Sequence, residues 1–122
     1  MKKELTKAEE QIMQAIWHVE KGFAKDILEQ LTEPKPAYNT VLTVIRVLVQ
    51  KGFVSYKTYG KSNEYYPLIT KENYSGNQLN KLQKNYFNNS PKALLSFFIT
   101  ENKLNLTELD EILKAINTPK ND

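Results

Sequence analysis

The chain has 122 residues, 40% of them hydrophobic, and a net charge of +3, which predicts one compact domain, or a domain with an appendage, that has a modest core. The absence of cysteine excludes disulfides and thiolate metal or redox sites. No apolar run approaches the roughly 18 residues of a membrane span, and residues 1–10 (MKKELTKAEE) lack the apolar segment of a signal peptide. We therefore expect a cytoplasmic protein with no membrane insertion.

The first predicted element is a helix that starts after Thr6. Residues 6–9 (TKAE) have the spacing of a capping box, in which Thr6 caps the helix and Glu9 bonds back to the Thr6 amide. Apolar residues at helical spacing continue the helix, and Gly22 predicts its end. Glu9 and Glu10 are adjacent rather than facing and have no histidine partner, so we expect both on a solvated face.

Two further helices are separated by a proline-containing break. Residues 24–31 (AKDILEQL) predict a short second helix, which Pro34 and Pro36 prevent from continuing. The third predicted helix begins near Tyr38 and stops at Gly52, within the stretch AYNTVLTVIRVLVQKGFV (residues 37–54). Its apolar residues recur at i, i+3, i+4 and i+7, which is typical of a core face, whereas a second stripe is polar. The core face holds Val41, Val44, Ile45 and Leu48, and the polar stripe holds Asn39, Thr43, Arg46 and Gln50.

The hydrophobic period then changes to that of strands. Residues 53–59 (FVSYKTY) alternate, residues 60–63 (GKSN) predict a turn, and residues 64–69 (EYYPLI) predict a returning strand. The tyrosines of these strands are expected to pack mainly as cross-strand pairs. Three helices followed by a hairpin predict a helix-turn-helix with a β wing.

The C-terminal part is predicted to be helical again. Ser90 caps a helix that Pro91 opens, and residues 94–99 are apolar on nearly all sides, which requires cover on all sides. The simplest cover is the same segment of a second chain, although folding back onto the winged helix of the same chain stays open. The residues expected at the interface of a homodimer are Leu79, Leu82, Tyr86, Leu94, Leu95, Phe98, Leu109, Ile112, Leu113 and Ile116.

The predicted fold is therefore mostly α with a β wing: an N-terminal winged helix-turn-helix domain over residues 1–70, followed by a C-terminal helical dimerisation region over residues 71–122. The charge pattern favours a polyanion as partner, because residues 34–63 contain five basic residues and no acidic one. A solvated helical face with chance clustering of charge is the alternative.

A winged helix presents its third helix to the major groove of double-stranded DNA. Asn39 can bond adenine, Arg46 can bond guanine, and a threonine or leucine can pack on a thymine methyl group. Leu42 lies outside the apolar face, so we expect it to be exposed and to contact DNA. Lysines before the helix and on the wing are placed for phosphates. The expected DNA-binding residues are Lys35, Tyr38, Asn39, Thr40, Leu42, Thr43, Arg46, Lys57 and Lys61.

Enzymatic functions find little support in the sequence. His18 is the only histidine and is expected to be a surface residue, the adjacent acidic residues form no facing pair, and no glycine-rich phosphate loop is present. We therefore expect neither an enzyme nor a bound cofactor or metal.

The order of several motifs resembles the BlaI/MecI family of penicillinase and methicillin-resistance repressors. Residues 5–17 (LTKAEEQIMQAIW) are similar to the opening helix of the family, residues 39–54 (NTVLTVIRVLVQKGFV) to its recognition helix, and residues 64–69 (EYYPLI) to its wing strand. Residues 92–113 (KALLSFFITENKLNLTELDEIL) are similar to its C-terminal helices. The resemblance runs in order over almost the whole chain.

The resemblance implies a homodimeric repressor that binds a dyad-symmetric operator and is released when a membrane sensor protease detects a β-lactam and the dimerisation helices are cut. The family is cut between an asparagine and a phenylalanine, and the matching pair here is Phe97 and Phe98. Leu42 and Val47 stand where arginine is found in relatives. The positions that match DNA-contacting residues of the family are Asn39, Thr40, Leu42 and Thr43.

Two other functions stay open at the level of sequence. One is a winged-helix module that binds a protein instead of DNA, which the single arginine and an exposed Leu42 would favour. The other is a ligand-responsive regulator that is not controlled by cleavage, with a pocket lined by Trp17, Phe87 and Phe97. DNA binding must fall steeply with added salt, whereas an apolar protein contact would not.

Overall fold

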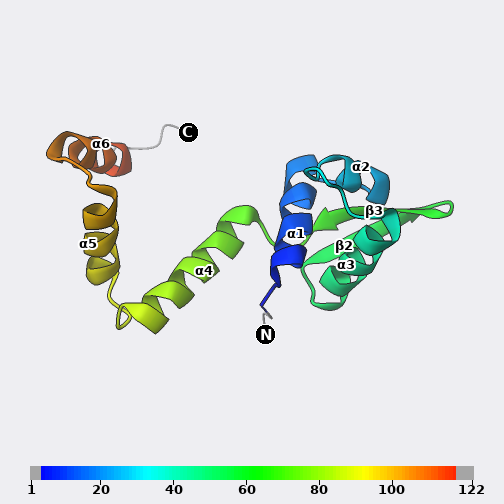
Figure 1. Ribbon diagram of the computed structural model, residues 1–122, viewed down its shortest axis with the longest axis horizontal. Coiled ribbons are helices and arrows are strands. Elements are labelled where there is room, and N and C mark those ends of the chain that lie inside the picture. The colour runs from blue at the N-terminus through cyan, green and yellow to red at the C-terminus, as the bar shows by residue number, and fades with distance from the viewer. Residues whose placement is uncertain (1–3, 118–122) are drawn as a thin grey trace. The chain divides into compact units, whose positions relative to one another are not determined.

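The computed structural model describes residues 4–117, so residues 1–3 and 118–122, at the outer ends of the two expected regions, lie outside the described part. The chain divides into two compact units, one up to Gly76 and one from Asn77 onwards. In chain order, the elements are α1 (Lys7–Val19), β1 (Gly22–Phe23), α2 (Ala24–Glu29), α3 (Tyr38–Gln50), β2 (Val54–Tyr59), β3 (Ser62–Pro67), α4 (Lys71–Tyr86), α5 (Pro91–Asn102) and α6 (Leu106–Asn117). Figure 1 labels all elements except the two-residue strand β1.

The capping box at the start of α1 is confirmed. The Glu9 amide donates to Thr6 Oγ1 at 3.2 Å, and the Thr6 amide donates to Glu9 Oε1 at 2.9 Å. The end of α1 differs from the expectation, because the residue with positive φ after the helix is Glu20 (φ 69°) and not Gly22. At Gly22 the backbone instead lies close to α2, since a Cβ at this position would lie 3.2 Å from the Cβ of Asp26, which is a tight contact.

The predicted hairpin is confirmed and belongs to a three-stranded antiparallel sheet with the strand order β1-β3-β2. The pairing of β2 with β3 continues to the last residue of β2, so the turn consists only of Gly60, with φ 61°, and Lys61. The two-residue strand β1 has no pattern of its own in the sequence. It is defined by its pairing with β3, in which Gly22 lies opposite Tyr65.

The core of the first unit is formed by α1, α2, α3 and the sheet. Val41, Ile45 and Leu48 of α3 each have 0% exposure, so the apolar face predicted for this helix is the buried one. Val44, the fourth residue of that face, is only half-buried. The buried hydrophobic residues are Ile12, Met13, Ala15, Ile16, Ala24, Ile27, Val41, Ile45, Leu48, Phe53, Val54, Tyr65, Ile69 and Tyr74.

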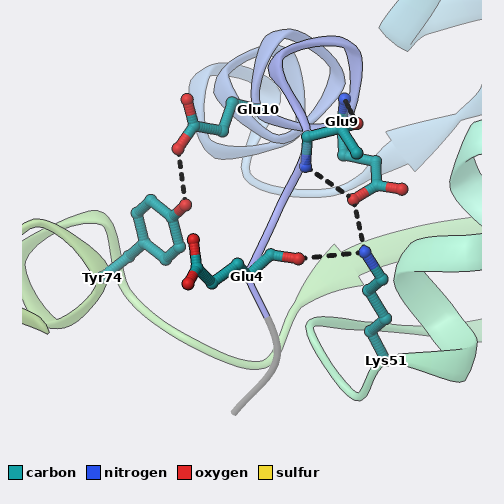
Figure 2. A network of polar contacts seen from close by, with 6 residues as sticks. Glu4, Glu9, Glu10, Lys51 and Tyr74 are labelled. Carbon is teal, nitrogen blue, oxygen red and sulfur yellow. Dashed lines mark hydrogen bonds and ion pairs between the residues drawn. The ribbon is translucent and has the colours of Figure 1, made fainter. Parts of the chain in front are cut away.

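Glu9 is buried, contrary to the solvated face expected for it. Lys51 directly follows α3, and its Nζ lies 2.6 Å from Glu9 Oε1, with the two side chains 19% and 12% exposed. The same Nζ donates to the backbone carbonyl of Glu4 at 3.0 Å (Figure 2). Burial by itself would raise the pKa of Glu9, but the hydrogen bond and charge of Lys51 and the bonds to Thr6 lower it below its ordinary value. The ion pair therefore ties the start of α1 to the end of α3.

The first turn of α4 is attached to the core of the first unit. Tyr74 is 9% exposed, and its hydroxyl donates to Glu10 Oε2 at 2.6 Å, so Glu10 is not simply solvated either (Figure 2). The Tyr74 ring centroid lies 5.6 Å from that of Trp17, whose Nε1 donates to the Ile69 carbonyl at 2.8 Å. Burial, together with the hydrogen bond and charge of Glu10, raises the pKa of Tyr74. These contacts explain why the first unit extends past the hairpin to Gly76.

The second unit contains the rest of α4 with α5 and α6. Ser90 caps α5 as predicted, since its Oγ accepts a hydrogen bond from the Ala93 amide at 3.0 Å. Asn105 and Glu108 form a reciprocal cap before α6. No residue between 77 and 117 is buried. Within residues 4–117, the helices lack the combination of length and apolar character that a membrane crossing requires.

Replacing Lys51 by methionine should destabilise the first unit by about 1–3 kcal/mol, because the buried Glu9 carboxylate loses its charged partner. The folded-state pKa of Glu9 is lowered from 4.5. The pair therefore stabilises the wild type fully above that pH, and this stability is lost as the pH falls through the folded-state pKa. The difference between Lys51→Met and wild type should shrink accordingly in acid. Urea unfolding between about pH 7 and about pH 3 measures this difference.

The matched control is Lys114→Met. It removes an ion pair of the same kind, between Lys114 and Asp110, whose side chains are 76% and 60% exposed. This exposed pair should contribute less than about 1 kcal/mol. Equal losses in the two variants, or a loss in Lys51→Met that stays constant in acid, would contradict the role given to the buried pair.

Candidate nucleic-acid interface

α3 displays a row of exposed polar side chains on the side away from the core. Asn39, Thr43 and Arg46 are exposed and follow one another at i, i+4 and i+7, which places them on one face. The Thr43 hydroxyl donates to the Asn39 backbone carbonyl at 2.9 Å, so its hydrogen is used within the helix while its oxygen can still accept. Arg46, the only arginine of the chain, ends the row.

A groove of about 940 Å³ runs beside this row, between α3 and the hairpin of β2 and β3. One side consists of α3 residues, the other side of residues from both strands and their turn, and the start of α2 completes the lining. We refer to it as the α3–wing groove. Its charged and phenolic lining includes Lys25, Asp26, Tyr38, Arg46, Tyr56 and Lys61.

Leu42 is half-buried and packs against the core, so the expectation that it is exposed was wrong. It lies four residues before Arg46 and seven before Val49, on a stripe of α3 that lines the α3–wing groove. Packing against the core therefore covers part of a side chain that the helical pattern alone assigns to solvent. The rest of Leu42 borders the groove next to Arg46.

The two wing lysines predicted to contact phosphates have different surroundings. Lys61 follows Gly60 in the turn of the hairpin, is exposed and lines the α3–wing groove. Lys57 is exposed on β2, and its Nζ lies 5.4 Å from the centroid of the Tyr59 ring. Both residues are exposed, but of the two only Lys61 lines the same groove as Arg46.

Three other residues of the basic stretch and of α3 are not brought together with Arg46. Lys35 is exposed and donates to the backbone carbonyl of Glu29 at 3.1 Å. Lys51 is neutralised by its ion pair with Glu9, which removes one cation from the displayed charge. Thr40 is exposed at the start of α3 but lines a second groove, of about 630 Å³, beside α1.

Tyr56 and Tyr65 form the expected cross-strand pair, with ring centroids 5.8 Å apart in an edge-to-face arrangement. Tyr56 is nevertheless 45% exposed and borders the α3–wing groove, as does Tyr38, which is 49% exposed. The wing tyrosines were predicted to serve mainly in packing. The strand alternation of β2 could have predicted that Tyr56 points inward toward the groove, because it puts Tyr56 on the same face of β2 as the buried Val54.

The residues predicted for a dimer interface lie on the surface of the single chain. Leu94 and Leu109 are half-buried, and the others are between 42% and 75% exposed. Phe97 is 54% exposed and its ring centroid lies 5.4 Å from that of Phe87, so these two aromatics pack on each other. The exposed members of the predicted interface are Leu79, Leu82, Tyr86, Leu95, Phe98, Ile112, Leu113 and Ile116.

Comparison with known sequences finds one family of repressors and its members. The model of the penicillinase repressor family matches residues 5–118. The chain is 29% identical over 119 residues to the methicillin resistance regulatory protein MecI of Staphylococcus aureus (strain N315), and this match covers 93% of the chain and 94% of the relative. The MecI proteins of Staphylococcus epidermidis and Mammaliicoccus sciuri match to the same extent.

Comparison with solved structures agrees with the N-terminal fold. The solution structure of the DNA-binding domain of the repressor BlaI matches with a TM-score of 0.52 and 25% sequence identity. This match covers 61% of the chain and 94% of the solved domain. Together with a family model that spans nearly the whole sequence, it shows that the chain belongs to the penicillinase repressor family, as a DNA-binding repressor of the BlaI/MecI type and not an enzyme.

Proposed function

We propose that the protein acts in the cytoplasm as a homodimer that binds a dyad-symmetric DNA operator through α3 and the wing. The observation that carries this proposal is the exposed row of Asn39, Thr43 and Arg46 beside the α3–wing groove with its cations. A helix whose apolar face is buried and whose polar row points outward can enter the major groove without rearrangement, because that groove is wide enough for a helix.

Base recognition is assigned to this row and its flanks. Asn39 is suited to bidentate bonding with adenine, and Arg46 to bidentate bonding with guanine. The Thr43 methyl group and the accessible edge of Leu42 are suited to apolar contact with a thymine methyl group. Thr40, on the other flank of the row, is within the same exposed first turn of α3.

Phosphate contacts are assigned to the exposed lysines. Lys57 and Lys61 lie on the wing, and Lys35 lies on the segment before α3. Such contacts hold the register of the protein on the duplex and carry no sequence information. They also make the affinity depend on salt, because each neutralised phosphate releases counterions.

A second copy of the chain is the proposed cover for the exposed apolar side chains of α4, α5 and α6. Leu95, Phe98 and Leu113 are each more than half exposed in the single chain, and extensive exposed apolar surface marks an interaction site. A two-fold dimer presents two copies of α3 to two half-sites. Operator affinity then exceeds that of either winged helix alone.

Release of the operator is proposed to follow cleavage between Phe97 and Phe98 under the control of a membrane sensor protease. Both side chains are exposed within α5. Cleavage would separate residues 98–122, which include all of α6, from the winged helix. The dimer would lose half of its proposed interface residues, and operator affinity would fall because the two half-sites are no longer bound together.

Arg46→Ala should weaken operator binding by about 1–3 kcal/mol and reduce discrimination between sequences, because a bidentate base contact is lost. Lys61→Ala should weaken binding to all sequences alike and reduce the salt slope by about one. Fluorescence anisotropy over a salt series measures both effects, with a labelled duplex from the region upstream of the protein's own gene and a scrambled duplex.

Lys114→Ala, in α6, is the control for a lost positive charge and should bind both duplexes like the wild type. Wild-type affinity for both duplexes in Arg46→Ala and Lys61→Ala would refute the roles given to α3 and the wing. Wild-type binding that does not fall with salt would point to a protein partner instead of DNA.

Leu113→Glu should convert the dimer into a monomer, because it places a charge in an apolar interface, and should weaken operator binding. Sedimentation equilibrium measures the association. Leu68→Glu is the matched control, because Leu68 and Leu113 are both 56% exposed in the single chain but Leu68 lies in the first unit. A monomeric wild type, or dissociation caused by Leu68→Glu instead, would contradict this interface.

Exposure of cells that carry the protein and a sensor to a β-lactam should produce a fragment that ends at Phe97. Intact-mass measurement of the recovered protein identifies the cleaved bond, and untreated cells are the control. Derepression with the chain intact, or a fragment that ends at another residue, would contradict cleavage at this site.

A further inference from the structure

Phenol groups from α3 and from β2 line the two sides of the α3–wing groove. Tyr38 begins α3 and is 49% exposed, and Tyr56 lies on β2 and is 45% exposed. Both line the groove. Within residues 4–117, neither hydroxyl has a hydrogen-bond partner, so each can donate to a ligand.

The charged residues of the groove favour an anion. Lys25, Arg46 and Lys61 contribute three positive charges, against the single carboxylate of Asp26. This carboxylate is already engaged, because its Oδ2 accepts a hydrogen bond from the Phe23 amide at 2.9 Å. A polyanion with apolar parts between its charges suits a groove that combines cations with aromatic rings.

The geometry of a winged helix on DNA indicates which part of the DNA would occupy the groove. If α3 lies in the major groove and the wing lies beside it, the sugar–phosphate strand that borders the major groove must pass between the two. The α3–wing groove is the space between them. This step rests on the proposed function, because it requires α3 to be the helix that enters DNA.

We propose that the α3–wing groove holds one sugar–phosphate strand of the operator and that Tyr38 and Tyr56 donate hydrogen bonds from their phenols to its phosphates. Each phenol is uncharged and releases no counterion when it binds a phosphate. The tyrosines therefore contribute affinity that depends on neither sequence nor salt. Lys61, in the same groove, contributes affinity that falls with salt.

The test uses the full chain with Tyr38→Phe and Tyr56→Phe, each of which removes one oxygen and keeps the ring. Each variant should bind the upstream duplex and the scrambled duplex about three- to tenfold more weakly per half-site, as expected for one lost neutral hydrogen bond. The salt slope should stay at its wild-type value. Thermal melting should confirm that both variants are folded.

Tyr66→Phe is the matched control. Tyr66 is 37% exposed on β3 and directly follows Tyr65, so strand alternation places it on the opposite face from Tyr65, which lines the groove. Its affinity should equal that of the wild type. A loss in Tyr66→Phe as large as in the other two variants would overturn the assignment to the groove.

A second measurement locates the phosphate. Duplexes in which one phosphate at a time is replaced by a neutral methylphosphonate should bind the wild type more weakly at the contacted position. At that position, the replacement should lower the affinity of Tyr56→Phe less than it lowers the affinity of the wild type, because both changes remove the same interaction.

Two results would overturn the inference while the proposed function stands. One is wild-type affinity in both groove variants. The other is that the loss of affinity from the methylphosphonate and the loss from Tyr56→Phe add in full at every phosphate position. Failure of the wild-type chain to bind the upstream duplex with any salt dependence would overturn the proposed function itself. The two failures are therefore distinguishable in the same experiment.

Discussion

The place of the proposed base contacts depends on the burial of one face of α3. Val41, Ile45 and Leu48 are fully buried, so the helix cannot rotate about its axis without exposing them to water. Because one face points inward, Asn39 and Arg46 point outward. The ion pair between Lys51 and Glu9 adds a polar attachment of the end of α3 to the start of α1, and recognition of DNA therefore begins with the packing of a small core.

The features that could be predicted from the sequence depend on residues close together along the chain. The capping box of Thr6 and Glu9 spans three residues, and the cap of Ser90 on α5 spans three. The apolar period of α3 and the alternation of the hairpin likewise repeat over one or two turns or a few strand residues. Family membership was visible in the order of such motifs, because an ordered series is more specific than any one motif.

The features that were missed depend on contacts between distant residues. Glu9 and Lys51 are 42 positions apart, and no local pattern predicts that a helix carboxylate will find a buried partner. Packing against the core covers part of Leu42, which the helical period alone assigns to solvent. A groove lined by phenols from α3 and β2 exists only when the hairpin folds back beside the helix, so the sequence could place Tyr38 and Tyr56 in their elements but not in a common site.

Because Tyr74 attaches the first turn of α4 to the core, the beginning and the rest of this helix differ in stability. The first turn of α4 is held by the bond to Glu10 and the ring contact with Trp17, so it opens only together with the core. Between residues 77 and 117 no side chain is buried, and the later turns of α4 depend on their own backbone bonds, which are marginal in an isolated helix. We therefore expect the amide hydrogens of α4 to exchange in two classes. The border between the classes should mark the end of the part of α4 that is held by the core of the first unit.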